Sequence, residues 1–227
     1  MTATIGFVSA ITGFAEEEKG RRTKIVTGYL PDGYEMRYID SPQSPRFLDS
    51  HENFDELRAA WINFFGTIDP EDVDVLIAAG GIDPALHEIR AACRVPVIGP
   101  GEASLYIAAS LGRPTTVLVV DDYAVAAAEI FLDQTQTKPP IASIRPLGTP
   151  VREILQDRAL GERALRRETM AAVQEDNAGA VFMGCMTLGS LGMAEDLQRE
   201  VGVPVLDPLR ISTAAAVQAA HALGVDS

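Results

Sequence analysis

Cys185 is the residue whose type and position best suit chemistry. It comes directly after a short apolar run, Ala180 to Met183, that stops at Gly184. A helix-like segment and a second apolar run, Val203 to Leu206, follow, so this stretch has the pattern of strand, helix, strand. Open α/β sheets bind ligands at the carboxyl ends of their strands, and a thiol just before a helix N-terminus has a lowered pKa. We therefore predict that Cys185 is a catalytic acid/base, which takes or gives a proton at a carbon beside a carbonyl.

Other residues near predicted strand ends are candidates to bind the substrate of such a reaction. An enolate that develops beside a carbonyl needs N–H or hydroxyl donors aimed at its oxygen. Backbone N–H groups at two helix N-termini suit that role, while hydroxyl groups suit a carboxylate. Each candidate also has a purely structural interpretation, as a turn glycine, a helix cap or the edge of the core. The predicted substrate-binding residues are Ser9, Gly80, Gly81, Tyr123, Met186 and Thr187.

Several acidic residues near the strand ends have two interpretations. Asp83 fits a helix cap better than a second base, a role for which His87 is the other nearby candidate. Asp121 or Asp122 either contacts a cationic group of the substrate or caps the helix that follows. Asp207 also lies near a strand end.

Strands and helices alternate through most of the chain, which predicts a parallel, doubly wound α/β protein. We expect Ile11 to Gly33, which shows no clear period, to be a long loop. The stretch from Pro150 to Asp176 is expected to be helical with a break at Gly161. The other predicted strands are 4–10, 34–39, 73–79, 95–98, 115–120 and 141–146, and the other predicted helices are 53–68, 84–93 with Asp83 as N-cap and Pro84 at its first position, 101–111, a segment from Asp121 to 133, and 211–223.

An internal repeat divides the chain. Residues 73–112 and 178–224 both run strand, glycine, helix, a strand with Val-Pro-Val, proline, and an Ala-rich helix that ends in Leu-Gly. Two similar halves predict two similar lobes, which we expect to be related by a pseudo-twofold with the active site in the cleft between them. We expect residues 1–101 with 208–227 to form the first lobe, and 102–207 the second.

The composition excludes some classes of partner and compartment. The 227 residues carry a net charge of −13, which argues against nucleic acid and anionic membranes as partners. No apolar run reaches the ~18–20 residues of a membrane helix, and the N-terminus lacks a basic segment typical of signal peptides. Two cysteines imply no disulfide framework, so a cytoplasmic location is expected. The three histidines lack metal-ligand spacing, so we expect no metal site.

The ordered set of motifs resembles the aspartate/glutamate/hydantoin racemase superfamily. The motifs are Gly80-Gly81 followed by DPAL, then PVIG with GEA, then Gly184-Cys185, and finally GVPVLDP. The resemblance implies two α/β lobes, no metal and no other cofactor, and an oligomer. It also implies a small-molecule substrate that is a carboxylate or a hydantoin-like ring, with two cysteines, one from each lobe, on opposite faces of its α-carbon.

The chain departs from this two-thiol pattern in its first half. Cys185 matches the second cysteine of the family, but the first falls on Gly80, or on Gly81 if the turn is shifted by one. Cys93 lies about three helical turns further on and cannot replace it. A glycine first and a cysteine second is similar to arylmalonate decarboxylases, in which a tyrosine that matches Tyr123 helps to bind a carboxylate.

Three functions follow as alternatives. The first is a racemase- or isomerase-type enzyme that moves a proton at a carbon next to a carboxylate or ring carbonyl. The second is a decarboxylase of a substituted malonate, with one-sided protonation by Cys185. The third is a non-catalytic protein that binds a small molecule in the same cleft.

Overall fold

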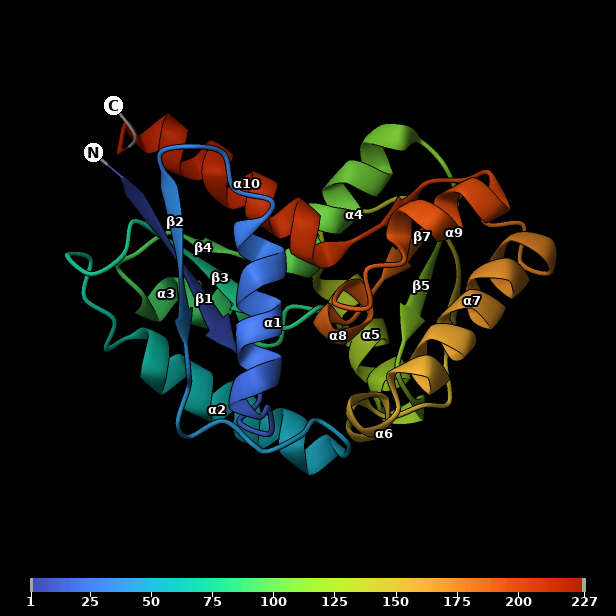
Figure 1. Cartoon of the computed structure of the whole chain (residues 1–227), viewed down its shortest axis with the longest axis horizontal. Helices are drawn as coiled ribbons and strands as arrows, with labels where there is room; N and C mark the ends of the chain where they lie inside the picture. The colour runs from blue at the N-terminus through green and yellow to red at the C-terminus, as the bar shows by residue number, and fades with distance from the viewer. Residues whose placement is uncertain (1, 226–227) are drawn as a thin grey trace. The chain divides into compact units, whose positions relative to one another are not determined.

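A computed structural model describes residues 2–225 of the chain. The chain divides into two compact units, Met1–Pro100 with Leu209–Ser227, and Gly101–Pro208. Each unit contains one four-stranded parallel sheet with helices around it (Figure 1). The predicted α/β class with two similar doubly wound lobes is therefore confirmed.

The sheet of the first unit has the strand order β2-β1-β3-β4. Its strands are β1 (Ala3–Ser9), β2 (Tyr34–Ile39), β3 (Val75–Ala79) and β4 (Val97–Ile98). The helices of this unit are α1 (Glu16–Thr27), α2 (His51–Phe65), α3 (Leu86–Ala92) and α10 (Pro208–Leu223).

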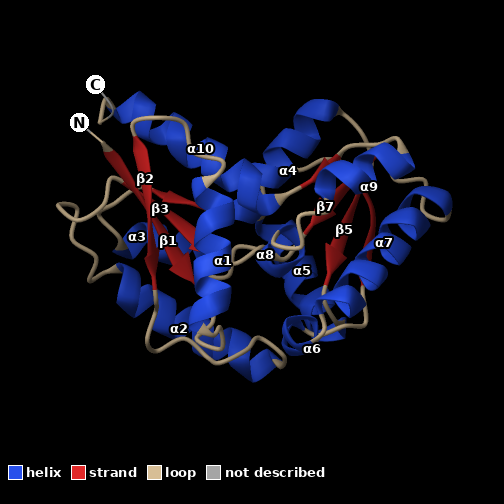
Figure 2. Cartoon of the chain, in the orientation of Figure 1, coloured by secondary structure: helices blue, strands red, loops and turns tan. Residues whose placement is uncertain are grey.

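The sheet of the second unit has the order β6-β5-β7-β8, and Figure 2 shows α5 and α7 flanking it. Its strands are β5 (Thr115–Val119), β6 (Ile141–Pro146), β7 (Ala180–Met183) and β8 (Val205–Leu206). The helices are α4 (Pro100–Leu111), α5 (Asp122–Gln134), α6 (Val151–Gln156), α7 (Arg158–Gln174), α8 (Met186–Gly189) and α9 (Ala194–Val201).

The two sheets have equivalent strand orders, so β1 to β4 correspond to β5 to β8. In both, the central strands are apolar and buried on both faces; every residue of β3, β5 and β7 is buried. The edge strands β2 and β6 are only partly buried. This arrangement puts the carboxyl ends of β1 and β3 side by side in one unit, and those of β5 and β7 side by side in the other.

The predicted loop from Ile11 to Gly33 is wrong, because this segment contains helix α1. The helix has few apolar residues, so it lacks the period by which an amphipathic helix is found. Charge pairs stabilise it instead: Glu18 accepts from Arg21 at 2.6 Å and from Arg22 at 2.7 Å. The Arg22 side chain is 2% exposed, and its guanidinium lies 4.0 Å from the centre of the Phe14 ring.

We predict that Gly20→Ala stabilises the protein by about 0.5–1 kcal/mol. Gly20 is exposed in the middle of α1, and an added Cβ would meet no atom within 4 Å. Alanine restricts the unfolded chain without introducing strain in the helix. Urea unfolding at constant m-value measures the gain. Gly33→Ala is the matched control, because the positive φ of 89° at Gly33 makes the same change destabilising.

Several predicted helix boundaries are also wrong, among them those of α3 and α7. Helix α3 begins at Leu86 rather than Pro84, and its N-cap is Ala85, not Asp83. Asp83 and Ala85 both have left-handed backbone, with φ of 49° and 60°, so the turn after β3 extends further than a Pro-initiated helix would allow. The long helical stretch breaks at Asp157, which caps α7, while Gly161 lies inside α7 against Ile154.

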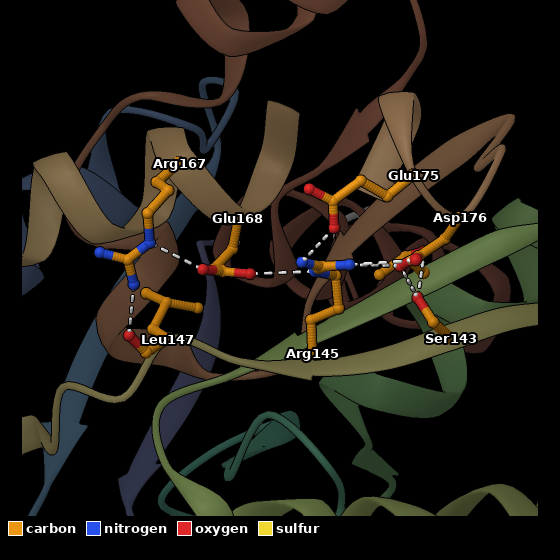
Figure 3. A network of polar contacts seen from close by, with 8 residues as sticks. Ser143, Arg145, Leu147, Arg167, Glu168, Glu175 and Asp176 are labelled. Carbon is orange, nitrogen blue, oxygen red and sulfur yellow. Dashed lines mark hydrogen bonds and ion pairs between the residues drawn. The ribbon is translucent and has the colours of Figure 1, made fainter. Parts of the chain in front are cut away.

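An ion-pair network ties the edge strand β6 to the end of α7 (Figure 3). Arg145 of β6 donates to Glu168 at 2.9 Å, to Glu175 at 3.0 Å and to Asp176 at 3.0 Å. Ser143 donates to Asp176 at 2.5 Å. Burial raises the pKa of Asp176, but the hydrogen bonds from Ser143 and Arg145 and the charge of Arg145 outweigh it, so the pKa lies below its ordinary value of 3.8.

We predict that Arg145→Gln lowers the free energy of unfolding by about 1 kcal/mol at pH 7. A carboxylate with a lowered pKa stabilises the fold above its unfolded value, and this contribution is lost as the pH falls through the folded value. The difference between wild type and variant should therefore be smaller at pH 3, below the ordinary pKa of 3.8, than at pH 7. Urea unfolding at both pH values tests this. Arg163→Gln is the control, since Arg163 and Asp157 form an exposed pair at 3.7 Å, which contributes little.

Candidate functional site

The predicted catalytic residue Cys185 lies between β7 and α8 in the second unit. The backbone N–H of Gly184 donates to Leu118 of β5 at 2.8 Å, so the end of β7 is held against its neighbour. Cys185 is the N-cap of α8, with extended backbone at φ −142° and ψ 132°. Its carbonyl accepts from Leu188 at 3.0 Å and from Gly189 at 3.4 Å, and the residue is partly exposed.

The helix-like segment predicted after Cys185 is two short helices, α8 and α9. Because α8 is a single turn, the effect of a helix dipole on the thiol is smaller than the sequence suggested. Further hydrogen bonds hold this turn: the Ser190 backbone N–H donates to Met186 at 3.0 Å, and its hydroxyl to Thr187 at 2.8 Å. Arg158 of α7 donates to the Leu191 carbonyl at 2.5 Å.

The other predicted site residues of the second unit lie on the same edge of its sheet. Met186 and Thr187 are both 4% exposed, in the first positions of α8. Tyr123 is 47% exposed in the first turn of α5, which follows the strand beside β7. Asp121 caps α5 by accepting from Ala124 at 3.0 Å, as one of its two interpretations predicted.

The predicted site residues of the first unit gather at the ends of β1 and β3. Ser9 pairs with Ala79 across the two strands, and Gly80 and Gly81 follow directly. Both glycines are buried, and Ser9 is 2% exposed. The Ser9 hydroxyl donates to the Ile11 carbonyl at 2.8 Å, so it closes the turn after β1.

The strand register decides which residue of the first unit corresponds to Cys185. Ile77 pairs with Ile98 in the first sheet, and Phe182 pairs with Leu206 at the same place in the second. Counting three residues on from each gives Gly80 and Cys185. Of the two alternatives left by the sequence, Gly80 rather than Gly81 is the equivalent position.

Position 80 has no room for a side chain. A Cβ built on Gly80 would lie 2.7 Å from Cδ of Pro84, 2.9 Å from its Cγ, and 3.2 Å from Cη2 of Trp61. Trp61 is fully buried, so this direction leads into the interior of the first unit. The Cβ of any other residue at this position would therefore meet Pro84 and Trp61.

The remaining candidates differ in burial. Asp83 is 8% exposed, with its carboxylate against Gly99, whereas His87 is exposed. Cys93 lies beyond the end of α3, and burial raises the pKa of its thiol. Asp207, at the end of β8, is 6% exposed, and its carboxylate packs against Gly189 of α8.

Residues 2–225 contain neither a membrane-spanning helix nor a cluster of metal ligands. None of the helices in this part of the chain is long and apolar enough to cross a membrane. Nor do the histidine, cysteine and acidic residues there form a group of three or more that could hold a metal ion.

Comparison with known proteins places the chain in a family. The family model Asp/Glu/Hydantoin racemase matches residues 21–220. The chain belongs to the Asp/Glu/hydantoin racemase family. A hydantoin racemase from a Pseudomonas species is 34% identical over 137 residues, which cover 60% of the chain and 54% of that racemase. The matched part thus spans about half the length of this relative.

Solved structures show the same two-lobed racemase fold. An allantoin racemase from Klebsiella pneumoniae is 21% identical with a TM-score of 0.83, covering 98% of this chain and 89% of its own. A mutant of arylmalonate decarboxylase in which a glycine is replaced by cysteine is 18% identical with a TM-score of 0.63, covering 96% and 93%. At these identities the likeness concerns the fold alone.

Membership of the Asp/Glu/hydantoin racemase family makes the difference between the two equivalent positions informative. The second unit has a partly exposed thiol at the end of β7, on a turn held by hydrogen bonds. The first unit has a glycine at the end of β3, packed against a proline and a tryptophan. Of the two equivalent positions, Gly80 and Cys185, only the second provides a thiol.

Proposed function

We propose that this protein is a one-thiol enzyme that moves the proton at the ring carbon of a hydantoin-like substrate, with Cys185 as the acid/base. The similarity to a hydantoin racemase supports the substrate class, and family membership supports the carbon acid chemistry. The observation that carries the proposal is the pair of equivalent positions, Cys185 and Gly80.

The proposed reaction needs only groups of this chain and water. The Cys185 thiolate removes the proton from the ring carbon, and the C–H electron pair moves into the adjacent carbonyl to give an enolate. We propose that the backbone N–H groups of Met186 and Thr187, the first two residues of α8, donate to the enolate oxygen. The Cys185 thiol then returns a proton to the carbon and becomes a thiolate again.

A single thiol that returns the proton to the face from which it was taken regenerates the starting enantiomer, so net racemisation also requires a slower protonation of the opposite face by water. In D₂O the thiol proton exchanges with solvent, so the ring carbon acquires deuterium while its configuration is kept. We expect proton NMR to show deuterium uptake into an optically pure 5-substituted hydantoin faster than polarimetry shows loss of rotation. Equal rates would contradict the one-thiol proposal and show a second base on the opposite face.

Decarboxylation of a substituted malonate is the second candidate, and the closed position at Gly80 favours it. Here the bond between the α-carbon and one carboxylate breaks, CO₂ leaves, and the electron pair stays as an enediolate. Cys185 then protonates one face, and the thiolate regains its proton from water. Release of CO₂ from an aryl- or alkylmalonate, with no deuterium uptake into hydantoins, would favour this reaction over the first.

A non-catalytic binding protein is the third alternative. Ligand binding that is unchanged in Cys185→Ala, with no turnover of hydantoins, amino acids or malonates by the wild type, would indicate it.

A further inference from the structure

We infer that Asp207 is a positioning residue that holds the turn carrying Cys185, through contact of its carboxylate with Gly189. Asp207 directly follows β8 and is 6% exposed. A Cβ built on Gly189 would lie 2.4 Å from Oδ1 of Asp207 and 3.4 Å from its Cγ. The carboxylate oxygen therefore occupies the space where any other residue at 189 would have a side chain.

Asp207 contacts helix α8, which is too short to be stable by itself. Helix α8 has four residues, and a single helical turn is not stable without tertiary contacts. Gly189 is its last residue, and the Gly189 N–H donates to the Cys185 carbonyl at 3.4 Å. Asp207 thus contacts Gly189 at the end of this turn, and Cys185 lies at its beginning.

The first unit has a similar contact between a carboxylate and a glycine, but with the two residue types exchanged between the turns. Its residue equivalent to Asp207 is Gly99. Gly99 directly follows Ile98, which pairs with Ile77, and Asp207 directly follows Leu206, which pairs with Phe182. A Cβ on Gly99 would lie 2.5 Å from Oδ2 of Asp83, so here the carboxylate comes from the turn after β3. Only in the second unit does a separate strand supply the carboxylate, and only there does the turn carry a thiol.

The kinetic part of this inference rests on the proposed function, but its principal test does not. The rate at which iodoacetamide alkylates Cys185 needs no substrate, and it depends on the setting of the thiol. It should be measured in the full chain with Cys93→Ser, so that only one thiol reacts. If no substrate turns over, the proposed function fails while the alkylation result still decides the role of Asp207.

We expect both Asp207→Ala and Gly189→Ala to raise the alkylation rate of Cys185 about threefold or more, because each relaxes or displaces the turn. The two changes act on one contact, so the double variant should resemble Asp207→Ala alone rather than show the product of both effects. Asp207→Asn keeps an oxygen against Gly189 and should stay within about twofold of the wild type. With a substrate, kcat should fall by about 10- to 100-fold in Asp207→Ala, while KM should change much less than kcat.

Asp157→Ala is the matched control in the same unit. Asp157 caps α7 by accepting from Leu160 at 3.2 Å, so its loss lowers the melting temperature without touching α8. Alkylation rates within twofold of the wild type in both Asp207→Ala and Gly189→Ala would overturn the inference. So would Asp207→Asn behaving like Asp207→Ala, or independent effects in the double variant. If Asp207→Ala does not fold, Gly189→Ala and Asp207→Asn still test the contact from both sides.

Discussion

Cys185→Ala should lower the rate of proton exchange at the substrate carbon by roughly 10² to 10⁴-fold, the usual contribution of a general acid/base. The proposed reaction has one thiol, and the equivalent position in the first unit is Gly80, so no second thiol compensates. Proton NMR in D₂O with 5-substituted hydantoins and substituted malonates measures the effect. The fold should persist, because Cys185 is partly exposed and its side chain makes no capping hydrogen bond to α8.

Cys93→Ser is the matched control for this variant. Cys93 is the other cysteine of the chain, and burial raises the pKa of its thiol. The serine variant should keep the exchange rate of the wild type within about twofold, since this residue lies beyond the far end of α3 from the β3 exit. Exchange that survives in Cys185→Ala but is lost in Cys93→Ser would reverse the assignment.

Gly80→Cys should destabilise the protein by about 1–3 kcal/mol and should not create a two-thiol racemase. The new Cβ would lie 2.7 Å from Cδ of Pro84, a separation that no packed structure keeps without a shift. The side chain would be directed toward Pro84 and the buried Trp61. Urea unfolding measures the loss of stability, and polarimetry shows whether racemisation catches up with deuterium uptake.

The double variant Gly80→Cys with Pro84→Ala tests the cause of this loss. Alanine lacks the Cγ and Cδ atoms that the new side chain would meet, so the two changes should be non-additive, and the double variant more stable than the sum of the single effects predicts. A Gly80→Cys protein as stable as the wild type, with racemisation as fast as exchange, would show that the turn after β3 rearranges freely.

The sequence predicted the buried strand β7 and the partly buried edge strands β2 and β6 well, because turn residues such as glycine, proline and aspartate flank all of them. Tyr34–Ile39, Ile141–Pro146 and Ala180–Met183 agree with the structure to the residue. Helix α1 was missed because charge pairs, not an apolar face, stabilise it. The turn at Asp83 was misjudged because a left-handed aspartate leaves no signal in an Asp-Pro pair that also suits a helix start.

The candidate site could be predicted in part for the same reason. Positions at strand ends are readable from where apolar runs stop, which identified Cys185 and Gly80. The contact between Asp207 and Gly189 could not be read, although Asp207 stands where the first repeat has Gly99. Seventeen residues separate Gly189 from Asp207 along the chain. Only the pairing of β7 with β8 and the packing of the turns that follow them bring the two residues into contact.

The sequence by itself therefore determined the α/β class, the internal repeat, and the presence of one cysteine where the repeat offers two positions. These features are local in the chain: apolar runs, turn residues and the order of motifs. Only the tertiary structure decided that Gly80 is the equivalent of Cys185 and that its side-chain direction is filled. Strand register and close packing set these facts, and both depend on atoms that are distant in sequence, such as Trp61 beside Gly80.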